Sequence, residues 1–250
     1  MRIIIPRGGL GNRLRFLEGV LTSGTNDKKI IIWCTDRSCH INPLDYFEFT
    51  LDNSRLFVLP KYVAPVLYFM LFVMSIINPN KVSLNSRQYI PNVWFESSPH
   101  AYEGSGTRFS SIRFSKKSRL LWEGLKLKHR FLLSSYDVCY LRGTDNIGAI
   151  EKTDFRKIFT ILEQSREVEH PMVGVTDDPI FRNIFSSYDI LLLRTMVPRR
   201  ERADSGEETI EDLLVLAHSK SIFSSAYSSF AELGVRLGQK NNLEVQSNTS

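Results

Sequence analysis

The chain has 250 residues, of which 42% are hydrophobic and 24% are charged. This composition is typical of a globular protein with one large or two modest domains, and it excludes a disordered or fibrous chain. The formal net charge of +5 favours an anionic ligand. Because no stripe of mixed basic and aromatic residues is present, nucleic acid is not an expected partner. The three cysteines cannot all pair and follow no metal-ligand spacing, which favours a reducing, cytoplasmic compartment.

Two apolar segments bear on targeting. The run at residues 2–5 is too short for a signal peptide, so we expect no secretion signal there and predict a strand instead. Residues 63–77 are apolar, but they fall short of the roughly 20 residues that a membrane span requires, and they contain Pro65. We interpret this segment as a buried helix. The alternative is peripheral contact between residues 63–77 and a membrane surface.

The N-terminal segment predicts a strand, a glycine turn and a helix. Gly8, Gly9 and Gly11 follow the first apolar run, and leucines then recur at helical spacing. Such a junction presents backbone N–H groups and the positive end of a helix to an anion, although the same glycines also fit a tight turn that binds nothing. The glycine spacing is not that of the dinucleotide fingerprint. Further elements are predicted as strands at 29–34, 55–59 and 92–95 and a helix at 115–128.

The second half alternates strands and helices more clearly. Because each strand is separated from the next by a helix, the strands are expected to be parallel. The prediction is therefore an α/β protein with two Rossmann-like domains, residues 1–128 and 129–250, whose parallel sheets face a cleft. Its elements are strands at 137–142, 172–176, 190–193 and 221–224, and helices at 155–162, after Pro179, at 209–218 and at 228–237.

Three of these strands end in polar residues, at 142–145, 176–178 and 224–229. Carboxyl ends of parallel strands share one edge of a sheet, and ligands of α/β proteins bind there. An arginine fork, serine hydroxyls and helix N-terminal amides are groups that bind phosphate, so we predict a phosphate-bearing ligand. The structural alternatives are an Arg142–Asp145 pair that closes a turn, and carboxylates and serines that only cap helices.

Four motifs occur in order along the chain: Gly8–Leu14, Leu141–Asp145, Val175–Pro179 and Phe223–Phe230. In this order and spacing the chain resembles the superfamily of α1,6-fucosyltransferases, nodulation fucosyltransferases and protein O-fucosyltransferases. The resemblance spans most of the chain and is weakest over residues 60–130. It implies a GT-B-like fold, GDP-fucose as the donor, inversion at the anomeric carbon, and no metal or other cofactor.

The resemblance also implies roles for individual residues. Arg142 matches the catalytic arginine that grips the β-phosphate and stabilises the departing diphosphate. Glu151 lies one residue from the position of the family's general base, at Ile150, and is the candidate base. Glu18, Asp36 and Glu96 compete with Glu151 for that role. The residues expected to bind the donor are Gly11, Asn12, Arg142, Asp145, Asp177, Asp178, Ser225, Ser228, Ser229 and Phe230.

The chain departs from the α1,6-enzymes near the key arginine. Tyr140 and Gly143 stand where those enzymes have a histidine and a second arginine. The expected function is a metal-independent, inverting transfer of L-fucose from GDP-fucose to a hydroxyl of an oligosaccharide or glycoconjugate, with residues 1–128 on the acceptor side and 129–250 on the donor side. Two alternatives stay open: a relative that uses another nucleotide sugar, such as a UDP-sugar, and a catalytically silent nucleotide- or glycan-binding protein of the same fold.

Overall fold

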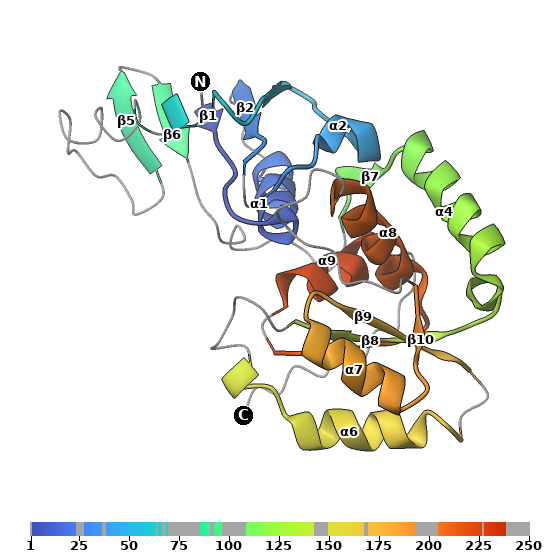
Figure 1. Cartoon of the computed structure of the whole chain (residues 1–250). Coiled ribbons are helices and arrows are strands. Elements are labelled where there is room, and N and C mark those ends of the chain that lie inside the picture. Colours follow the sequence, from blue (N-terminus) through green and yellow to red (C-terminus); the bar gives the residue numbers. More distant parts are fainter. Residues whose placement is uncertain are drawn as a thin grey trace. The chain divides into compact units, whose positions relative to one another are not determined.

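A computed structural model of the chain divides into two compact units, residues 1–115 and 116–250, which are described separately (Figure 1). The parts of the chain that the structure describes are residues 2–23, 28–36, 39–63, 65, 66, 69, 86–90, 93–96, 109–142, 150–167, 170–193, 205–226 and 228–238.

The first unit contains a five-stranded sheet with the strand order β4-β2-β1-β6-β5. Four strands are parallel, as the alternation of strand and helix predicts, and helix α1 connects β1 to β2. Strand β5 is antiparallel to β6, because only two residues join these strands and a parallel connection needs a dozen or more. The bounds are β1 Arg2–Ile4, α1 Leu10–Thr22, β2 Lys29–Cys34, β4 Ser54–Leu59, β5 Ser86–Ile90 and β6 Val93–Glu96.

A second, smaller sheet of the first unit escaped prediction. The helical turn α2 (Pro43–Tyr46) leads into β3 (Phe47–Phe49), which pairs antiparallel with β7 (Ile112–Phe114). The rings of Phe47 and Phe114 stack across this pair with centroids 5.8 Å apart. Strands of three residues are too short for a period-two pattern to be recognised in the sequence.

The predicted buried helix at residues 63–77 lies mostly outside the described residues. Its described part contradicts burial, because the side chains of Val66 and Phe69 are 58% and 65% exposed. No helix among the described residues has both the length and the apolar character needed to cross a membrane.

The second unit contains a four-stranded sheet in which every pair of neighbours is parallel. Its order is β10-β9-β8-β11, so the chain moves outward from β8 to β10 and then crosses back to place β11 on the other side of β8. The strand order therefore reverses between β8 and β11. The strands are β8 Asp137–Leu141, β9 Met172–Thr176, β10 Leu191–Leu192 and β11 Ile222–Ser224.

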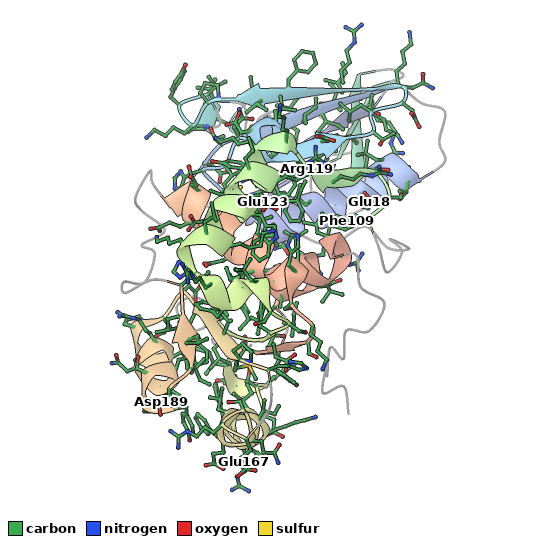
Figure 2. The ribbon with its side chains drawn as sticks, turned by 90° about the vertical axis from the view of Figure 1, so that its right-hand side faces the viewer. Glu18, Phe109, Arg119, Glu123, Glu167 and Asp189 are labelled. Atoms are coloured by element: carbon green, nitrogen blue, oxygen red, sulfur yellow. The ribbon has the colours of Figure 1, made fainter. Side chains whose placement is uncertain are left out.

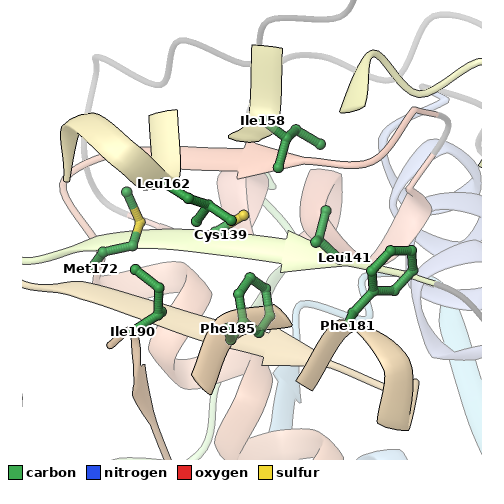
Figure 3. Packing of buried hydrophobic residues seen from close by; sticks show 8 residues of the cluster. All are labelled: Cys139, Leu141, Ile158, Leu162, Met172, Phe181, Phe185 and Ile190. Atoms are coloured by element: carbon green, nitrogen blue, oxygen red, sulfur yellow. The ribbon is translucent and has the colours of Figure 1, made fainter. Parts of the chain in front are cut away.

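Helices cover both faces of this sheet (Figure 1). Helices α6 (Phe155–Gln164) and α7 (Pro179–Ser187) bury one face, where Cys139 and Leu141 of β8 point into an apolar cluster (Figure 3). Alternate residues of a strand face opposite sides, and Tyr140 accordingly contacts Phe230 of α9 (Ser229–Leu237). Helix α8 packs against α9 and against α4. The bounds of these last elements are α4 Lys116–Lys128, the 3-10 turn η1 Arg130–Leu133, and α8 Ser205–His218.

Gly174, in the middle of β9, permits a close approach between the sheet and α7. A Cβ atom at this position would lie 2.6 Å from Cδ2 of Phe185, whose ring is fully buried. We expect Gly174→Ala to lower the free energy of unfolding by about 1–3 kcal/mol, because the buried ring has to shift. Chemical denaturation measures this change.

Gly124→Ala is the matched control. Gly124 lies within α4, and a Cβ atom there meets nothing within 4 Å, so the substitution should preserve or raise stability. Equal destabilisation by the two substitutions would contradict the packing assigned to Gly174.

Candidate functional site

The carboxyl ends of β8, β9 and β11 bring the predicted strand-end residues together. Leu141 pairs with Thr176, so Arg142 and Asp177 follow at the same level on adjacent strands. On the other side of β8, Tyr140 pairs with Ser224, and the backbone N–H of Arg142 donates to Oγ of Ser225 over 3.2 Å. Arg142 thus stands between Asp177 and Ser225. This position is the reversal point of the strand order, where open α/β sheets bind ligands.

Ser225 and Thr153 fix the loops at this edge of the sheet. Ser225 is 2% exposed, and its backbone N–H donates to the carbonyl of Tyr140 over 3.0 Å. The next backbone N–H, from Ala226, donates to Oγ1 of Thr153 over 3.0 Å. Thr153 was not among the predicted site residues. Its contact joins segments 73 residues apart, and no local sequence pattern announces such a partner.

Ser228 caps helix α9, as the structural alternative proposed. Its side chain accepts from the backbone N–H of Ala231 over 3.1 Å. Ser229 and Phe230 form the first turn, where backbone N–H groups lack partners within the helix and the helix dipole is positive. The helix therefore begins four residues after Ser225, and its positive end lies at the polar edge of the sheet. Capping by Ser228 and anion binding by the first turn are compatible.

The two aspartates after β9 take different positions. Asp178 is the N-cap of α7, since its Oδ1 accepts from the backbone N–H of Ile180 over 2.7 Å and its own N–H donates to Oγ1 of Thr176 over 3.1 Å. Its predicted structural role is thus confirmed. Asp177 is half-buried beside Arg142 and does not cap the helix.

The remaining predicted residues of this unit are less closely associated with Arg142. Glu151 is exposed in a short helical segment that precedes α6. Glu151 forms no hydrogen bond or ion pair with the residues that the structure describes. Asp145, and with it the predicted Arg142–Asp145 pair, lies outside the described residues.

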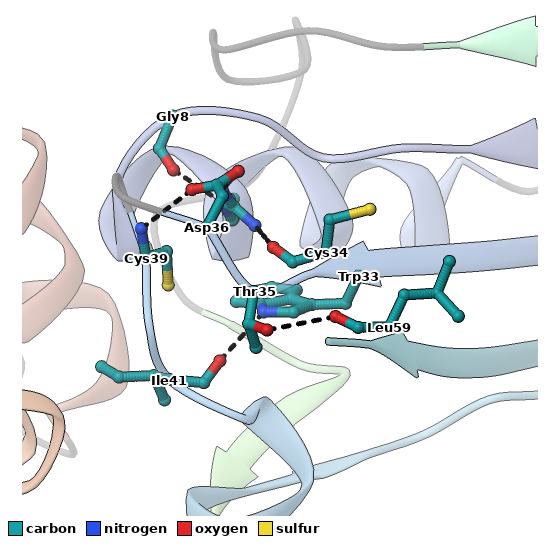
Figure 4. Close-up of polar contacts among 9 residues, drawn as sticks. Gly8, Trp33, Cys34, Thr35, Asp36, Cys39, Ile41 and Leu59 are labelled. Carbon is teal, nitrogen blue, oxygen red and sulfur yellow. Dashed lines mark hydrogen bonds and ion pairs between the residues drawn. The ribbon is translucent and has the colours of Figure 1, made fainter. Parts of the chain in front are cut away.

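In the first unit the glycine turn is held by a buried arginine. Gly8 has φ +82°, a conformation that favours glycine, and α1 begins two residues later. Arg13 is fully buried, and its Nε donates to the carbonyl of Gly8 over 2.6 Å. The same guanidinium donates to the carbonyl of Cys34, at the end of β2, and forms an ion pair of 2.6 Å with Asp36 (Figure 4). Arg13 therefore ties the loops that follow β1 and β2 to each other.

The predicted residues of the glycine turn lie on α1 itself. Gly11 is buried within the first turn of the helix, and Asn12 accepts a 3.0 Å hydrogen bond from Nη2 of Arg15 through its side-chain oxygen. Arg13 was overlooked as a site-forming residue, although it belongs to the same motif. Burial distinguishes it from its neighbour Arg15, and burial of one particular arginine is not readable from the motif.

Glu18 and Asp36, two of the alternative candidates for the general base, have carboxylates that are hydrogen-bonded within the first unit. Glu18 is 1% exposed and accepts from the backbone N–H groups of Ser110 and Ser111 and from Oγ of Ser110 over 2.6–3.2 Å. These hydrogen bonds occupy its carboxylate and connect α1 to the segment before β7. Asp36 is engaged by Arg13 and also accepts from the backbone N–H of Cys39 over 3.1 Å. The side chain of Glu96 lies outside the described residues.

The buried cysteines and the possible metal-binding side chains were also considered as reactive groups. Burial raises the pKa of the Cys139 thiol to about 12, so this cysteine stays protonated and is a poor nucleophile at neutral pH. Burial likewise raises the pKa of the Cys39 thiol. Within the described parts of the chain, no group of three histidine, cysteine or acidic side chains is placed to hold a metal ion.

The two sheets with their helices give the chain a GT-B-like α/β fold, as predicted. Solved structures of NodZ α1,6-fucosyltransferase share this fold. One was co-crystallised with GDP and another was soaked with GDP-fucose, and each matches with a TM-score of 0.57 and 13% sequence identity over 95% of this chain and 92% of that chain. The structure of NodZ from Bradyrhizobium matches equally well over 93% and 91%. No protein-family model matches the chain, and no curated protein matches it in sequence.

The network around Arg13 predicts a strong dependence of stability on this side chain. Replacing Arg13 by Leu leaves the Asp36 carboxylate and the carbonyls of Gly8 and Cys34 without the donor that they bind. We expect this substitution to lower the free energy of unfolding by about 3–5 kcal/mol. Thermal or chemical unfolding measures this loss. Arg55→Leu, at an exposed position of β4, is the control and should change stability little. A small effect of Arg13→Leu would contradict a buried, paired guanidinium.

Proposed function

We propose that the chain is a metal-independent, inverting glycosyltransferase that moves L-fucose from GDP-fucose to a hydroxyl of an oligosaccharide or glycoconjugate. The observation that carries this proposal is the position of Arg142 at the reversal point of the second sheet, beside Ser225 and the start of α9. The fold shared with NodZ, which was co-crystallised with GDP and soaked with GDP-fucose, supports this choice of donor.

In this proposal the second unit binds the donor diphosphate. The planar guanidinium of Arg142 provides a bidentate contact to phosphate oxygens, and the first-turn amides of α9, including those of Ser229 and Phe230, provide neutral donors. Asp177, which directly follows β9, lies at the level of Arg142 and can orient its guanidinium or accept from ribose hydroxyls. Asp145, Asp178 and Ser228 retain the donor-side roles that the resemblance implies. Asp178 and Ser228 contribute mainly by fixing the helices that they cap.

The proposed reaction is a single displacement. The acceptor oxygen attacks C1 of fucose while the bond between C1 and the β-phosphate oxygen breaks, so the configuration at C1 inverts and GDP departs with both bonding electrons. Negative charge grows on the β-phosphate during this step. A fixed cation at Arg142 therefore stabilises the transition state more than the ground state. No metal ion is required in this scheme, since a guanidinium and helix amides neutralise the leaving group.

The acceptor must lose a proton as it attacks, and we propose Glu151 as the base that takes it. Glu151 precedes α6, close in sequence to Thr153, whose hydroxyl is bonded to the loop after Ser225. Its carboxylate is exposed and has no bond to the described residues, so it is available to an acceptor hydroxyl. The competing carboxylates of Glu18 and Asp36 are already engaged. The glycine turn with Gly11 and Asn12, in residues 1–128, belongs to the acceptor side in this proposal.

Calorimetric titration with GDP, UDP, CDP and ADP in the presence of a chelator tests the donor. We expect the chain to prefer GDP, and Arg142→Ala to weaken GDP binding about tenfold to a hundredfold through the loss of a charge-assisted contact. The melting temperature should be nearly unchanged, since the bond to Ser225 uses the backbone of residue 142.

Arg156→Ala, at an exposed position of α6, is the matched control and should bind GDP like the parent chain. A preference for UDP would be consistent with the proposed role of Arg142 at the diphosphate but would indicate a UDP-sugar as the donor. No binding to any nucleotide, or equal weakening by both substitutions, would contradict the proposed donor site.

The base is tested by Glu151→Gln. If Glu151 accepts the proton, this substitution should reduce the rate of transfer to an acceptor about a hundredfold to ten-thousandfold while GDP binding is retained. The assay is fucose transfer from labelled GDP-fucose to a panel of oligosaccharides. Glu163→Gln, at an exposed position of α6, should leave the rate unchanged. Unaltered turnover in Glu151→Gln would remove Glu151 from the mechanism.

A further inference from the structure

Helix α4 and the following turn η1 expose several large apolar side chains. Leu120 and Leu127 are 63% and 82% exposed, and Leu133 of η1 is 66% exposed. Residues seven apart lie on the same face of a helix, so Leu120 and Leu127 are neighbours on the outer side of α4. Gly124 lies between them in sequence, and a side chain added there would meet nothing within 4 Å. The middle of this outer face is therefore apolar and open.

The opposite side of α4 holds the helix against the second unit. Ser118, Trp122 and Leu125 are buried on that side. The indole of Trp122 stacks on the imidazole of His218 at the end of α8, with ring centroids 4.2 Å apart and planes 16° from parallel. The two leucines of the outer face thus do not belong to the core, and a helix firmly packed on one side presents them to the surroundings.

The same stretch is strongly basic. Residues 116–133 contain six lysines and arginines and a single glutamate, so their formal charge is as large as that of the whole chain, +5. Glu123 forms an ion pair of 2.8 Å with Lys126, beside the ring of Trp122. Figure 2 shows α4 from outside, with Arg119 and Glu123 labelled. The basic residues are Lys116, Lys117, Arg119, Lys126, Lys128 and Arg130.

The positions of the charges relative to the leucines are those of an interfacial helix. At 100° per residue, Lys117 and Lys128 flank the line through Leu120 and Leu127 on one side, and Lys116 and Arg119 flank it on the other. Long basic side chains can extend sideways to lipid phosphates while the leucines enter the boundary between head groups and acyl chains. We name Leu120, Leu127, Lys116, Lys117 and Lys128 the α4 face.

We propose that the α4 face binds the surface of a membrane that contains anionic lipids. Its positive charge complements lipid phosphates, each basic group near such a surface adds to the attraction, and the exposed leucines add a contact that a purely polar surface lacks. A duplex or single-stranded nucleic acid would use the charges but would gain nothing from two leucines at the centre of the face. This proposal does not depend on the donor or on the reaction.

Co-sedimentation with vesicles tests this proposal. The full chain should sediment with vesicles of phosphatidylglycerol and phosphatidylcholine in equal parts and stay in solution with pure phosphatidylcholine, and added salt should weaken the binding. The double substitution Leu120→Ser and Leu127→Ser should lower the partition coefficient at least about tenfold, since two apolar side chains lose their contact with lipid. Its melting temperature should hold because both side chains are exposed.

Further variants test whether vesicle binding depends on the α4 face in particular or on any exposed apolar side chain. Ile180→Ser removes an apolar side chain that is 67% exposed on α7 and should leave vesicle binding unchanged. Lys117→Glu with Lys128→Glu should abolish binding to the anionic vesicles. Wild-type binding by the leucine variant, no sedimentation of the parent chain with anionic vesicles, or binding to a DNA duplex without binding to vesicles would each overturn the proposal.

Discussion

The arrangement of the second unit depends on the parallel pairing of β8 with β9 on one side and β11 on the other. This register, together with the reversal of strand order at β8, places one arginine at the polar edge of the sheet with a carboxylate and a serine beside it. Main-chain hydrogen bonds to Ser225 and Thr153 then fix the loops that carry these groups. The site is therefore a product of sheet topology, and its residues come from three separate strand–helix units.

Two arginines illustrate how environment decides the use of one residue type. Arg13 is enclosed, and its donors are satisfied by a carboxylate and two carbonyls, so its charge stabilises the fold. Arg142 is only half-buried, and its main chain makes the bond to Ser225. A motif scan treats the two alike, since both directly follow conspicuous glycine or strand patterns. The difference arises from packing that involves residues far away in sequence.

Much of the fold could be predicted because the long elements have strong periodicity. β2 and β9 coincide with their predicted ranges, α4 begins one residue after its predicted start, and α6 buries Ile158 and Leu162 of its predicted apolar face. The short strands β3, β5 and β7 were missed, since three to five residues give no clear period. The start of α8 lies four residues before the predicted start, within a charged stretch that obscures the apolar pattern.

The candidate site was predictable where polar residues end a predicted strand, and unpredictable where the contacts are long-range. Arg142, Asp177 and Ser225 met at one edge because parallel strands bring their carboxyl ends together. The bond from Ala226 to Thr153 depends on how two loops fold over that edge, which strand patterns do not encode. The exposure of Val66 and Phe69 likewise contradicts an interpretation based on hydropathy alone, because apolar runs do not reveal what covers them.

A hydrogen bond from the backbone N–H of residue 142 to Ser225 links the ends of β8 and β11. Because the donor is a main-chain group, this bond does not depend on the side chain at position 142. Every amino acid except proline can supply this donor. This link therefore places no further demand on the residue type at position 142. At a strand end of this kind, the side chain can change during evolution while the main-chain hydrogen bond to the neighbouring strand is kept.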